Sequence, residues 1–398
     1  MMLMRTQAEG KKVIVVQDPE QVANTVMLPG DLESILLMLD GKNTLRDIQA
    51  ALTRRMGGQI VPIGDIKKLM FELDSNLLLD SPRFHETIDM AVHFWRAFRI
   101  RQPFHAGQAY EKDPEKLNKM IEGFYESEDG PGRPSKKGRF VRGLLAPHID
   151  IRSGGPTFAW AYREIAQAPA ADLYVIFGTA HHPSPGPFSL TLKDYMTPLG
   201  IMPTDTDFAD KLLKKFSPEW LTHDIVHRGE HSIEFQVVFL QQALGPESKA
   251  PALPVLAGFG QPINEAAPPW ENADITGFLD ALAETAKESG KRITYIVGGD
   301  LAHIGPRYGD SNAVIPSDLE SCSEKDHAML DLAAKGDSRA FYKYIADEED
   351  RRNICGMPPL YAMLRMLEGT TGKLLRYEHW DDQPTRSAVT FASMVWHE

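Results

Sequence analysis

Histidine side chains follow short apolar segments at several places in this chain. His148 comes directly after RGLLAP, His181 after DLYVIFGTA and His303 after ITYIVGGDLA. These segments have the length of buried strands, and in open α/β sheets ligands bind outside the carboxyl ends of the strands. A single histidine after a strand is usually structural. Three that follow the same pattern favour one shared site in which imidazole groups bind a metal.

Carboxylates and a thiol accompany these histidines. Asp300 lies in the same GGDLAH run as the last histidine, and the polar pair Glu230-His231 follows a further apolar run. Cys355 lies in NICGMPP, where glycine and proline predict a tight turn at the start of a helix. Neutral imidazole and thiolate bind transition metals, and a carboxylate orients an imidazole or takes an open position. The sequence therefore predicts a metal site, although Cys355 also fits a small buried hydrophobe.

The composition is that of an ordinary globular protein, with 42% hydrophobic and 25% charged residues among 398. The net charge of −12 argues against broad nucleic-acid binding, because such a surface repels phosphate. The N-terminus lacks a secretory signal, and no segment approaches the ~20 apolar residues that cross a bilayer. We therefore expect a cytoplasmic protein without a membrane span. Its second cysteine, Cys322, lies in the polar, surface-like stretch SDLESCSEKD and is expected to be incidental.

The elements that must position these residues divide into two predicted domains. From residue 141 onward, apolar runs alternate with helical stretches, which predicts an α/β sheet flanked by helices within a domain at 89–398. Residues 1–88 instead predict a small α+β winged-helix module. Its expected elements are a strand at 11–18, three helices close to 32–39, 44–57 and 63–73, and a wing strand at 77–80. A helical connector is expected over 83–100.

The N-terminal module resembles a known family. The run VMLPGDLESILLMLDGKNTLRDIQAALTRRMG and the closing LLLD resemble PqqD-like domains, the winged-helix modules that recognise leader peptides in ribosomal-peptide modification systems. The resemblance implies a peptide-binding role. A generic winged helix with a structural or oligomerisation role fits the same pattern. A DNA-binding winged helix fits less well, because Arg46, Arg54 and Arg55 form only a thin basic face.

Residues 100–398 resemble the Memo family, whose fold is similar to that of class III non-haem iron extradiol dioxygenases of the LigB type. The matching motifs are PFHAGQAY, LLAPHIDIRSGG, VIFGTAHHPSPGPFSLTLKDYMTPLG, EHSIEFQVVFLQ, PVLAGFG, VGGDLAHIGPRYGD and NICGMPP. The resemblance implies a site for iron or copper formed by His148, His181 and Cys355. Zinc also accepts two histidines and a cysteine, with water in the fourth position. Cys355 stands where the dioxygenases carry a carboxylate, which argues against ring cleavage.

The same resemblance implies roles for neighbouring residues. His303 matches the acid/base histidine of the dioxygenases and has Asp300 beside it. Glu230 and His231 are expected to line the same pocket. In this chain APHID replaces the family's APHAGY, so Asp150 is expected to add a ligand or to narrow the site.

A PqqD-like module before a Memo domain looks like the B component of AmmeMemoRadiSam systems. This implies a radical-SAM protein and an AMMECR-like protein as partners. One hypothesis is therefore a metal-dependent oxidoreductase. A second is a non-catalytic adaptor that binds a peptide or partner through the same cleft and the N-terminal module. A third is a metal-free scaffold in which the histidines hydrogen-bond to one another.

Overall fold

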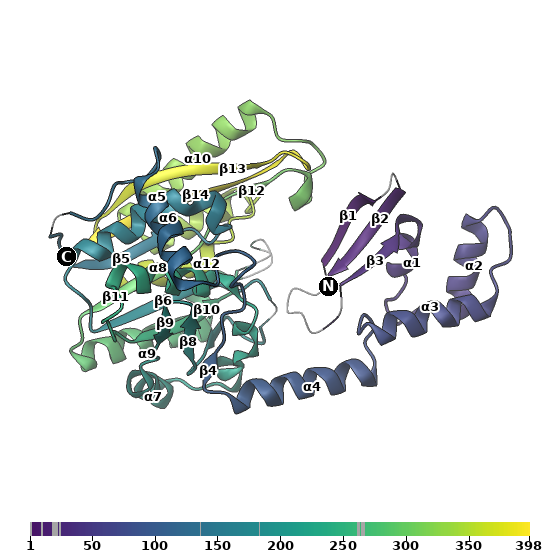
Figure 1. Ribbon diagram of the computed structural model, residues 1–398, viewed down its shortest axis with the longest axis horizontal. Helices are drawn as coiled ribbons and strands as arrows, with labels where there is room; N and C mark the ends of the chain where they lie inside the picture. The colour runs from purple at the N-terminus through teal and green to yellow at the C-terminus, as the bar shows by residue number, and fades with distance from the viewer. Residues whose placement is uncertain are drawn as a thin grey trace. The chain divides into compact units, whose positions relative to one another are not determined.

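The chain forms two compact units, residues 1–98 and residues 99–398. A computed structural model describes residues 2–8, 11–17, 23, 25–135, 137–182, 184–260, 263 and 267–398 (Figure 1). The expected boundary at residues 88/89 falls within a helix, α4 (Pro82–Ala97), which continues almost to the division between the units.

The first unit combines a small sheet with helices. Its three strands pair in the order β1-β2-β3, and they are β1 (Met2–Ala8), β2 (Lys11–Gln17) and β3 (Val26–Pro29). The last residue of the strand expected at 11–18 lies outside the described residues. The helices are η1 (Gly30–Leu32), α1 (Glu33–Leu36), α2 (Leu45–Arg55), α3 (Ile63–Ser75) and α4. Buried Ile35, Ile48 and Ile66 form a hydrophobic cluster between α1, α2 and α3.

Local sequence accounts for the helix boundaries of this unit. Thr44 caps α2, because its hydroxyl accepts the backbone N–H of Asp47 and the Asp47 carboxylate accepts that of Thr44. The wing strand expected at 77–80 is wrong. Leu77 has a positive φ of 61°, which ends α3, and Ser81 then caps α4 directly, so turn and bend occupy this segment.

The second unit is built on an eight-stranded sheet of order β12-β14-β5-β11-β6-β10-β7, with β13 paired to β14. The parallel strands are β5 (Val141–Ala146), β11 (Ile293–Gly298), β6 (Leu173–Thr179) and β10 (Ala252–Ala257). The antiparallel strands are β7 (Phe188–Leu190), β12 (His303–Ile304), β13 (Gly372–Asp382) and β14 (Ser387–His397). A separate sheet pairs β4 (Ile100–Arg101), β8 (Asp194–Thr197) and β9 (Gly200–Met202).

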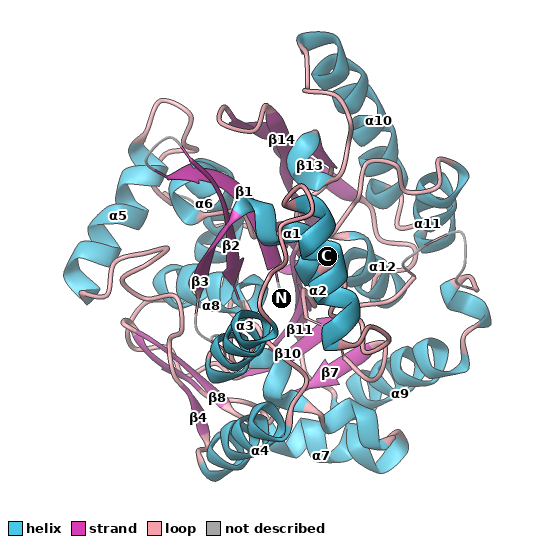
Figure 2. Ribbon diagram, turned by 90° about the vertical axis from the view of Figure 1, so that its right-hand side faces the viewer, coloured by secondary structure: helices cyan, strands magenta, loops and turns pink. Residues whose placement is uncertain are grey.

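Helices cover both faces of this sheet, as the sequence predicts for an α/β domain (Figure 2). One face carries α5 (Pro114–Glu126), α6 (Ile151–Gln167) and α8 (His231–Leu244). The other carries α7 (Thr206–Lys215), α9 (Ala273–Ser289), α10 (Pro316–Ala334), α11 (Ser338–Asp347) and α12 (Met357–Met366). Short 3-10 turns are η2 (Glu219–Thr222), η3 (Asp224–His227), η4 (Pro269–Glu271) and η5 (Pro306–Tyr308). Covered on both faces, the central strands are mainly apolar, and every residue of β6 is buried.

Candidate metal centre

The carboxyl ends of three neighbouring strands bring the predicted residues together. His148 follows β5, His181 follows β6 and Asp300 follows β11. These strands are adjacent and parallel, so their ends meet at one edge of the sheet. Glu230 and His231 lie at the same edge of the sheet, but they do not follow a strand as expected. Glu230 is the N-cap of α8 and His231 is its first residue.

Cys355 lies directly before α12, as its glycine and proline neighbours predict. Gly356 is the N-cap of that helix, and its backbone N–H donates to the carbonyl of Asp300 at 2.9 Å. A Cβ on Gly356 would lie 2.5 Å from the same carbonyl oxygen. Glycine is therefore required for the turn to approach the end of β11, and this close approach places the thiol beside the histidines.

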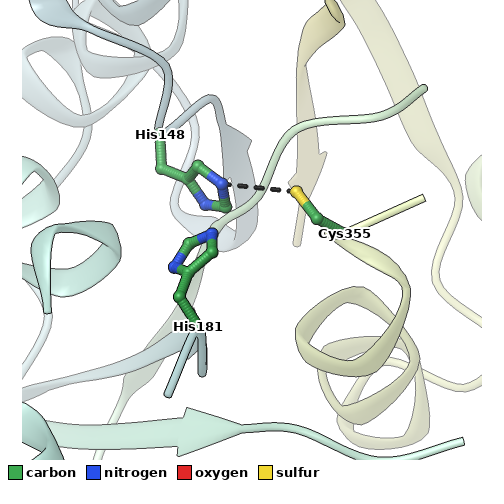
Figure 3. A group of neighbouring side chains, drawn as sticks. All are labelled: His148, His181 and Cys355. Carbon is green, nitrogen blue, oxygen red and sulfur yellow. Dashed lines mark hydrogen bonds between the residues drawn. The ribbon is translucent and has the colours of Figure 1, made fainter. Parts of the chain in front are cut away.

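The side chains of His148, His181 and Cys355 converge, with one ligand atom of each within 4.8 Å of the others (Figure 3). The Sγ of Cys355 lies 3.3 Å from Nε2 of His148. The Nδ1–H of His148 donates to the carbonyl of Gly298 at 3.0 Å, so Nε2 carries no proton. In the metal-free protein Nε2 accepts the Cys355 thiol, and it is the nitrogen that could bind an ion. His148 is buried, and Cys355 is partly buried.

Glu230 fixes the second histidine in the same way. Its carboxylate accepts the Nδ1–H of His181 at 2.9 Å and the backbone N–H of the same residue at 2.9 Å. It also accepts the backbone N–H of Ser232 at 3.0 Å and lies 3.3 Å from Nδ1 of His231. Both carboxylate oxygens are thus already engaged. Glu230 is therefore placed to orient His181 and not to bind an ion itself.

Burial sets the protonation of these groups. It lowers the pKa of His148 to about 3 and, aided by the charge on His181, lowers the pKa of His231 well below its usual value. Burial alone also lowers the pKa of His181, but the Glu230 carboxylate outweighs it and the pKa is raised. Burial and the nearby Asp300 carboxyl raise the pKa of the Cys355 thiol. In the metal-free protein the ligand set is therefore neutral at His148 and Cys355.

A cavity of about 220 Å³ opens beside the cluster and includes His148, His181, His231, Asp300 and His303 in its lining. His303 lies on β12, and its Nδ1–H is shared between the carbonyls of Leu301 at 3.1 Å and Asn353 at 3.2 Å. Its Nε2 is therefore the nitrogen left for a proton transfer into the cavity. Burial lowers the pKa of His303, so this nitrogen is free of a proton at neutral pH.

The donor set fits a transition metal. In both imidazoles the Nδ1–H is bonded to a carbonyl or a carboxylate, which makes Nε2 the nitrogen that would bind an ion, the usual arrangement behind metal-binding histidines. A thiolate and two imidazoles suit iron, copper and zinc alike. Asp150 does not join this set, because its carboxylate caps α6 by accepting the backbone N–H of Arg152 at 2.8 Å.

Comparison with known proteins identifies the family of the larger unit. Residues 101–395 match the family described as Memo-like protein. The chain belongs to the Memo family. A MEMO1 family protein of Aquifex aeolicus is 28% identical over 387 residues, covering 96% of each chain. A MEMO1 family protein of Methanosarcina acetivorans is 31% identical over 288 residues, covering 71% of this chain and 93% of the relative.

Among solved structures, an uncharacterized protein of Escherichia coli K12 aligns with a TM-score of 0.39 and 13% identity, over 64% of this chain and 99% of that one. The Memo match contains all the residues of the candidate metal centre but not the first unit. The Aquifex relative aligns across nearly the whole chain, so its match extends into the first unit as well. No helix in the described part of this Memo protein is long and apolar enough to cross a membrane.

Several residues around the Memo site were missed by sequence reasoning. Arg307, Tyr308 and Trp380 also line the cavity, and Arg307 pairs with Asp382 at 3.0 Å. The PRY triplet at 306–308, three residues after His303, was a usable signal for Arg307 and Tyr308, because residues close to a strand-end histidine share its edge of the sheet. Trp380 comes from β13, and its sequence carries no comparable signal.

A fully buried ion pair under the Memo site was also missed. Arg101 pairs with Glu234, and the guanidinium donates to the backbone carbonyl of Glu230 at 2.9 Å. Glu234 additionally accepts the Tyr110 hydroxyl. The expectation that Cys322 is a surface residue is wrong, because Cys322 lies on the buried side of α10 with 4% of its surface exposed.

Proposed function

We propose that this Memo protein binds iron or copper through His148, His181 and Cys355 and acts as a redox component. The observation that carries the proposal is the convergence of the three ligand atoms within 4.8 Å, with both histidines held in the ligating tautomer. Zinc remains an alternative occupant because it accepts the same donors. As part of this proposal, the larger unit is related to LigB-type dioxygenases. Cys355 stands in place of their carboxylate ligand, which argues against ring cleavage.

The residues around the ion have distinct tasks. A redox metal would supply electron transfer, and the chain supplies ligand geometry and proton transfer. His148 is held by Gly298, and His181 is held by Glu230. His303 and His231 both line the cavity, and their lowered pKa values leave both without a proton at neutral pH. His303 is proposed as the proton acceptor, because a pKa as strongly lowered as that of His231 makes an imidazole a weak base. Asp300 lies 3.6 Å from Nε2 of His148 and adjusts the charge at the site.

Metal analysis tests the proposal. Protein is purified anaerobically without chelators or a His-tag, and the metal content of wild type is compared with His148→Ala, His181→Ala and Cys355→Ser. We expect about one iron or copper ion per chain in wild type and a sharp loss in all three variants. His182→Ala is the matched control, because this neighbouring histidine is outside the convergent set. Equal metal content in wild type and variants, or none even after reconstitution with Fe(II) or Cu(I), would reject the site.

A second function, partner binding, is favoured by the first unit. It is separately compact and exposes large apolar side chains, among them Met27, Leu37, Ile60 and Phe71. A contiguous exposed apolar surface marks sites that bind other proteins, and we propose that these side chains contribute to one. We propose that the unit is a PqqD-like module that recognises a peptide, or a radical-SAM or AMMECR-like protein in the cytoplasm, and that the larger unit acts as an adaptor in that assembly.

Removal of the first unit distinguishes the two functions. Residues 99–398 are compared with the full chain in pull-down of the radical-SAM protein and in metal content. Loss of the partner with retained metal supports a recognition role for the first unit. Partner binding that is unchanged by the deletion would reject that role and leave the metal proposal untouched.

A further inference from the structure

Asp326 is a buried carboxylate outside the cavity that nevertheless connects several segments of the site. It lies on α10 with 0% of its surface exposed. One oxygen pairs with the guanidinium of Arg352, and the other accepts the hydroxyls of Tyr377 at 2.9 Å and Thr390 at 2.6 Å. Its partners come from the turn before α12 and from strands β13 and β14. Because a buried charge without its partner is costly, this carboxylate holds these segments in place.

Arg352 lies in the turn that carries Cys355, and the backbone of this turn is unusual. Glu349, Asp350 and Asn353 have φ values of 57°, 48° and 51°. The backbone of a residue other than glycine adopts this left-handed region uncommonly, although Asp and Asn tolerate it better than most. Arg352 is anchored on one side by Asp326 and on the other by Glu348, whose carboxylate accepts its Nε–H at 2.8 Å. The ion pairs of Arg352 therefore hold the strained backbone that positions the thiol.

The same anchor reaches His303 by two routes. The backbone N–H of His303 donates to the carbonyl of Arg352 at 2.6 Å, and the side chain of Asn353 donates to the carbonyl of His303 at 3.1 Å. From the other side, the hydroxyl oxygen of Thr390 accepts the backbone N–H of Ala302 at 2.9 Å while that hydroxyl donates to the Asp326 carboxylate. The backbone on both sides of His303 is thus tied to one buried carboxylate.

We propose that Asp326 is a positioning residue that, through Arg352 and Thr390, fixes the turn that carries the Cys355 thiol and the backbone that carries the His303 imidazole. Its partners Arg352, Tyr377 and Thr390 are not among the candidate metal ligands. The expected effect on metal binding rests on the proposed function. The contacts of Asp326 exist in the metal-free protein as well.

The first test measures cobalt(II) binding, with the thiolate-to-cobalt charge-transfer band as the signature of Cys355. Asp326→Asn keeps the shape of the side chain but removes the charge that pairs with Arg352. We expect about tenfold weaker cobalt binding and a weaker charge-transfer band, as for other residues that support metal ligands. The matched control is Asp205→Asn, which removes a buried carboxylate that pairs with Lys291 and caps α7 away from the site. The control is expected to bind cobalt like wild type.

The second test uses the metal-free protein and a smaller perturbation. Alkylation of Cys355 by iodoacetamide, followed by mass spectrometry, is expected to be severalfold faster in Thr390→Val than in wild type. Thr390→Ser, which keeps the hydroxyl, should restore the wild-type rate. If Asp326→Asn does not fold, Thr390→Val alone decides. Unchanged alkylation and unchanged cobalt binding in the folded variants overturn the inference. Wild-type protein that binds no metal rejects the proposed function, whereas the alkylation comparison still tests the role of Asp326.

Discussion

The Sγ of Cys355 lies 3.3 Å from Nε2 of His148, although 207 positions separate the two residues in the chain. The contact exists because the turn before α12 packs against the end of β11, which lies beside the end of β5. Each partner comes with its own support. A carbonyl holds the imidazole tautomer, and a glycine without room for a Cβ holds the turn.

Replacing Glu230 by glutamine is expected to weaken metal binding by about 10- to 100-fold, the usual cost of losing a residue that supports a ligand. The amide would retain an acceptor for Nδ1–H of His181, but its NH₂ group would then face a backbone N–H that the carboxylate now accepts. The loss of negative charge also makes His181 a poorer ligand. Competition with a chromophoric chelator measures the affinity. Glu219→Gln, at an exposed position, is the control, and a Glu230→Gln affinity equal to that of the control would contradict the support role.

Sequence patterns predicted the parts of the site that depend on local structure. His148 and His181 could be placed because each follows a continuous apolar run, and Cys355 because Gly356 and the prolines mark a helix start. The pairing of Arg101 with Glu234 could not be predicted, because 133 positions separate them and only the packing of β4 against α8 joins them.

The errors of prediction also have physical reasons. Cys322 lies among polar residues, but one face of α10 turns inward and buries the thiol beside Asp326. The LLLD run has the apolar content of a strand, but the left-handed conformation of Leu77 ends one helix and the next begins at Pro82. Local composition predicts neither outcome. Tertiary packing buries Cys322, and the backbone conformation of Leu77 prevents a strand at 77–80.

The free energy of unfolding of the metal-free protein is expected to depend on pH because of Asp300. Burial raises the pKa of this carboxyl from 3.8 to about 6, so between these values the folded protein holds a proton that the unfolded chain has lost. Stability must therefore fall as the pH rises through this window, and a shift of this size corresponds to about 3 kcal/mol.

Asp300→Asn removes this dependence while keeping an oxygen that accepts the backbone N–H of His148. Relative to wild type, the variant should gain up to about 3 kcal/mol in free energy of unfolding between pH 4 and pH 7. Urea unfolding of both proteins at several pH values gives this difference directly. A difference that stays constant across the range would mean that Asp300 is ionised in the folded protein throughout.

Breaking the buried ion pair beneath the site is expected to destabilise the larger unit strongly. Glu234→Gln leaves the Arg101 guanidinium buried without a countercharge, which typically costs about 3–5 kcal/mol. Urea unfolding measures the loss. In Glu126→Gln, the removed carboxylate belongs to an exposed pair with Arg133, so a change of no more than about 1 kcal/mol is expected. A similar loss of unfolding free energy in the two variants would show that burial does not increase the contribution of the Arg101–Glu234 pair to stability.

Adding one methyl group at Gly356 should disturb the site without removing any ligand. The new Cβ would lie 2.5 Å from the carbonyl oxygen of Asp300, so the turn must move away from the end of β11 and take Cys355 with it. Overpacking of this kind costs about 1–3 kcal/mol, and the displaced thiol should weaken both metal affinity and the thiolate-to-cobalt band.

Gly123→Ala provides the comparison for that substitution, because nothing lies within 4 Å of a Cβ added at this position in α5. Alanine there should leave cobalt binding unchanged and stabilise the helix by up to about 1 kcal/mol. Thermal unfolding and cobalt titration of the two variants separate the effects. If Gly356→Ala binds cobalt with wild-type affinity and spectrum, the close approach of the turn to Asp300 does not set the position of the thiol. The metal centre would then tolerate a looser arrangement than the structure shows.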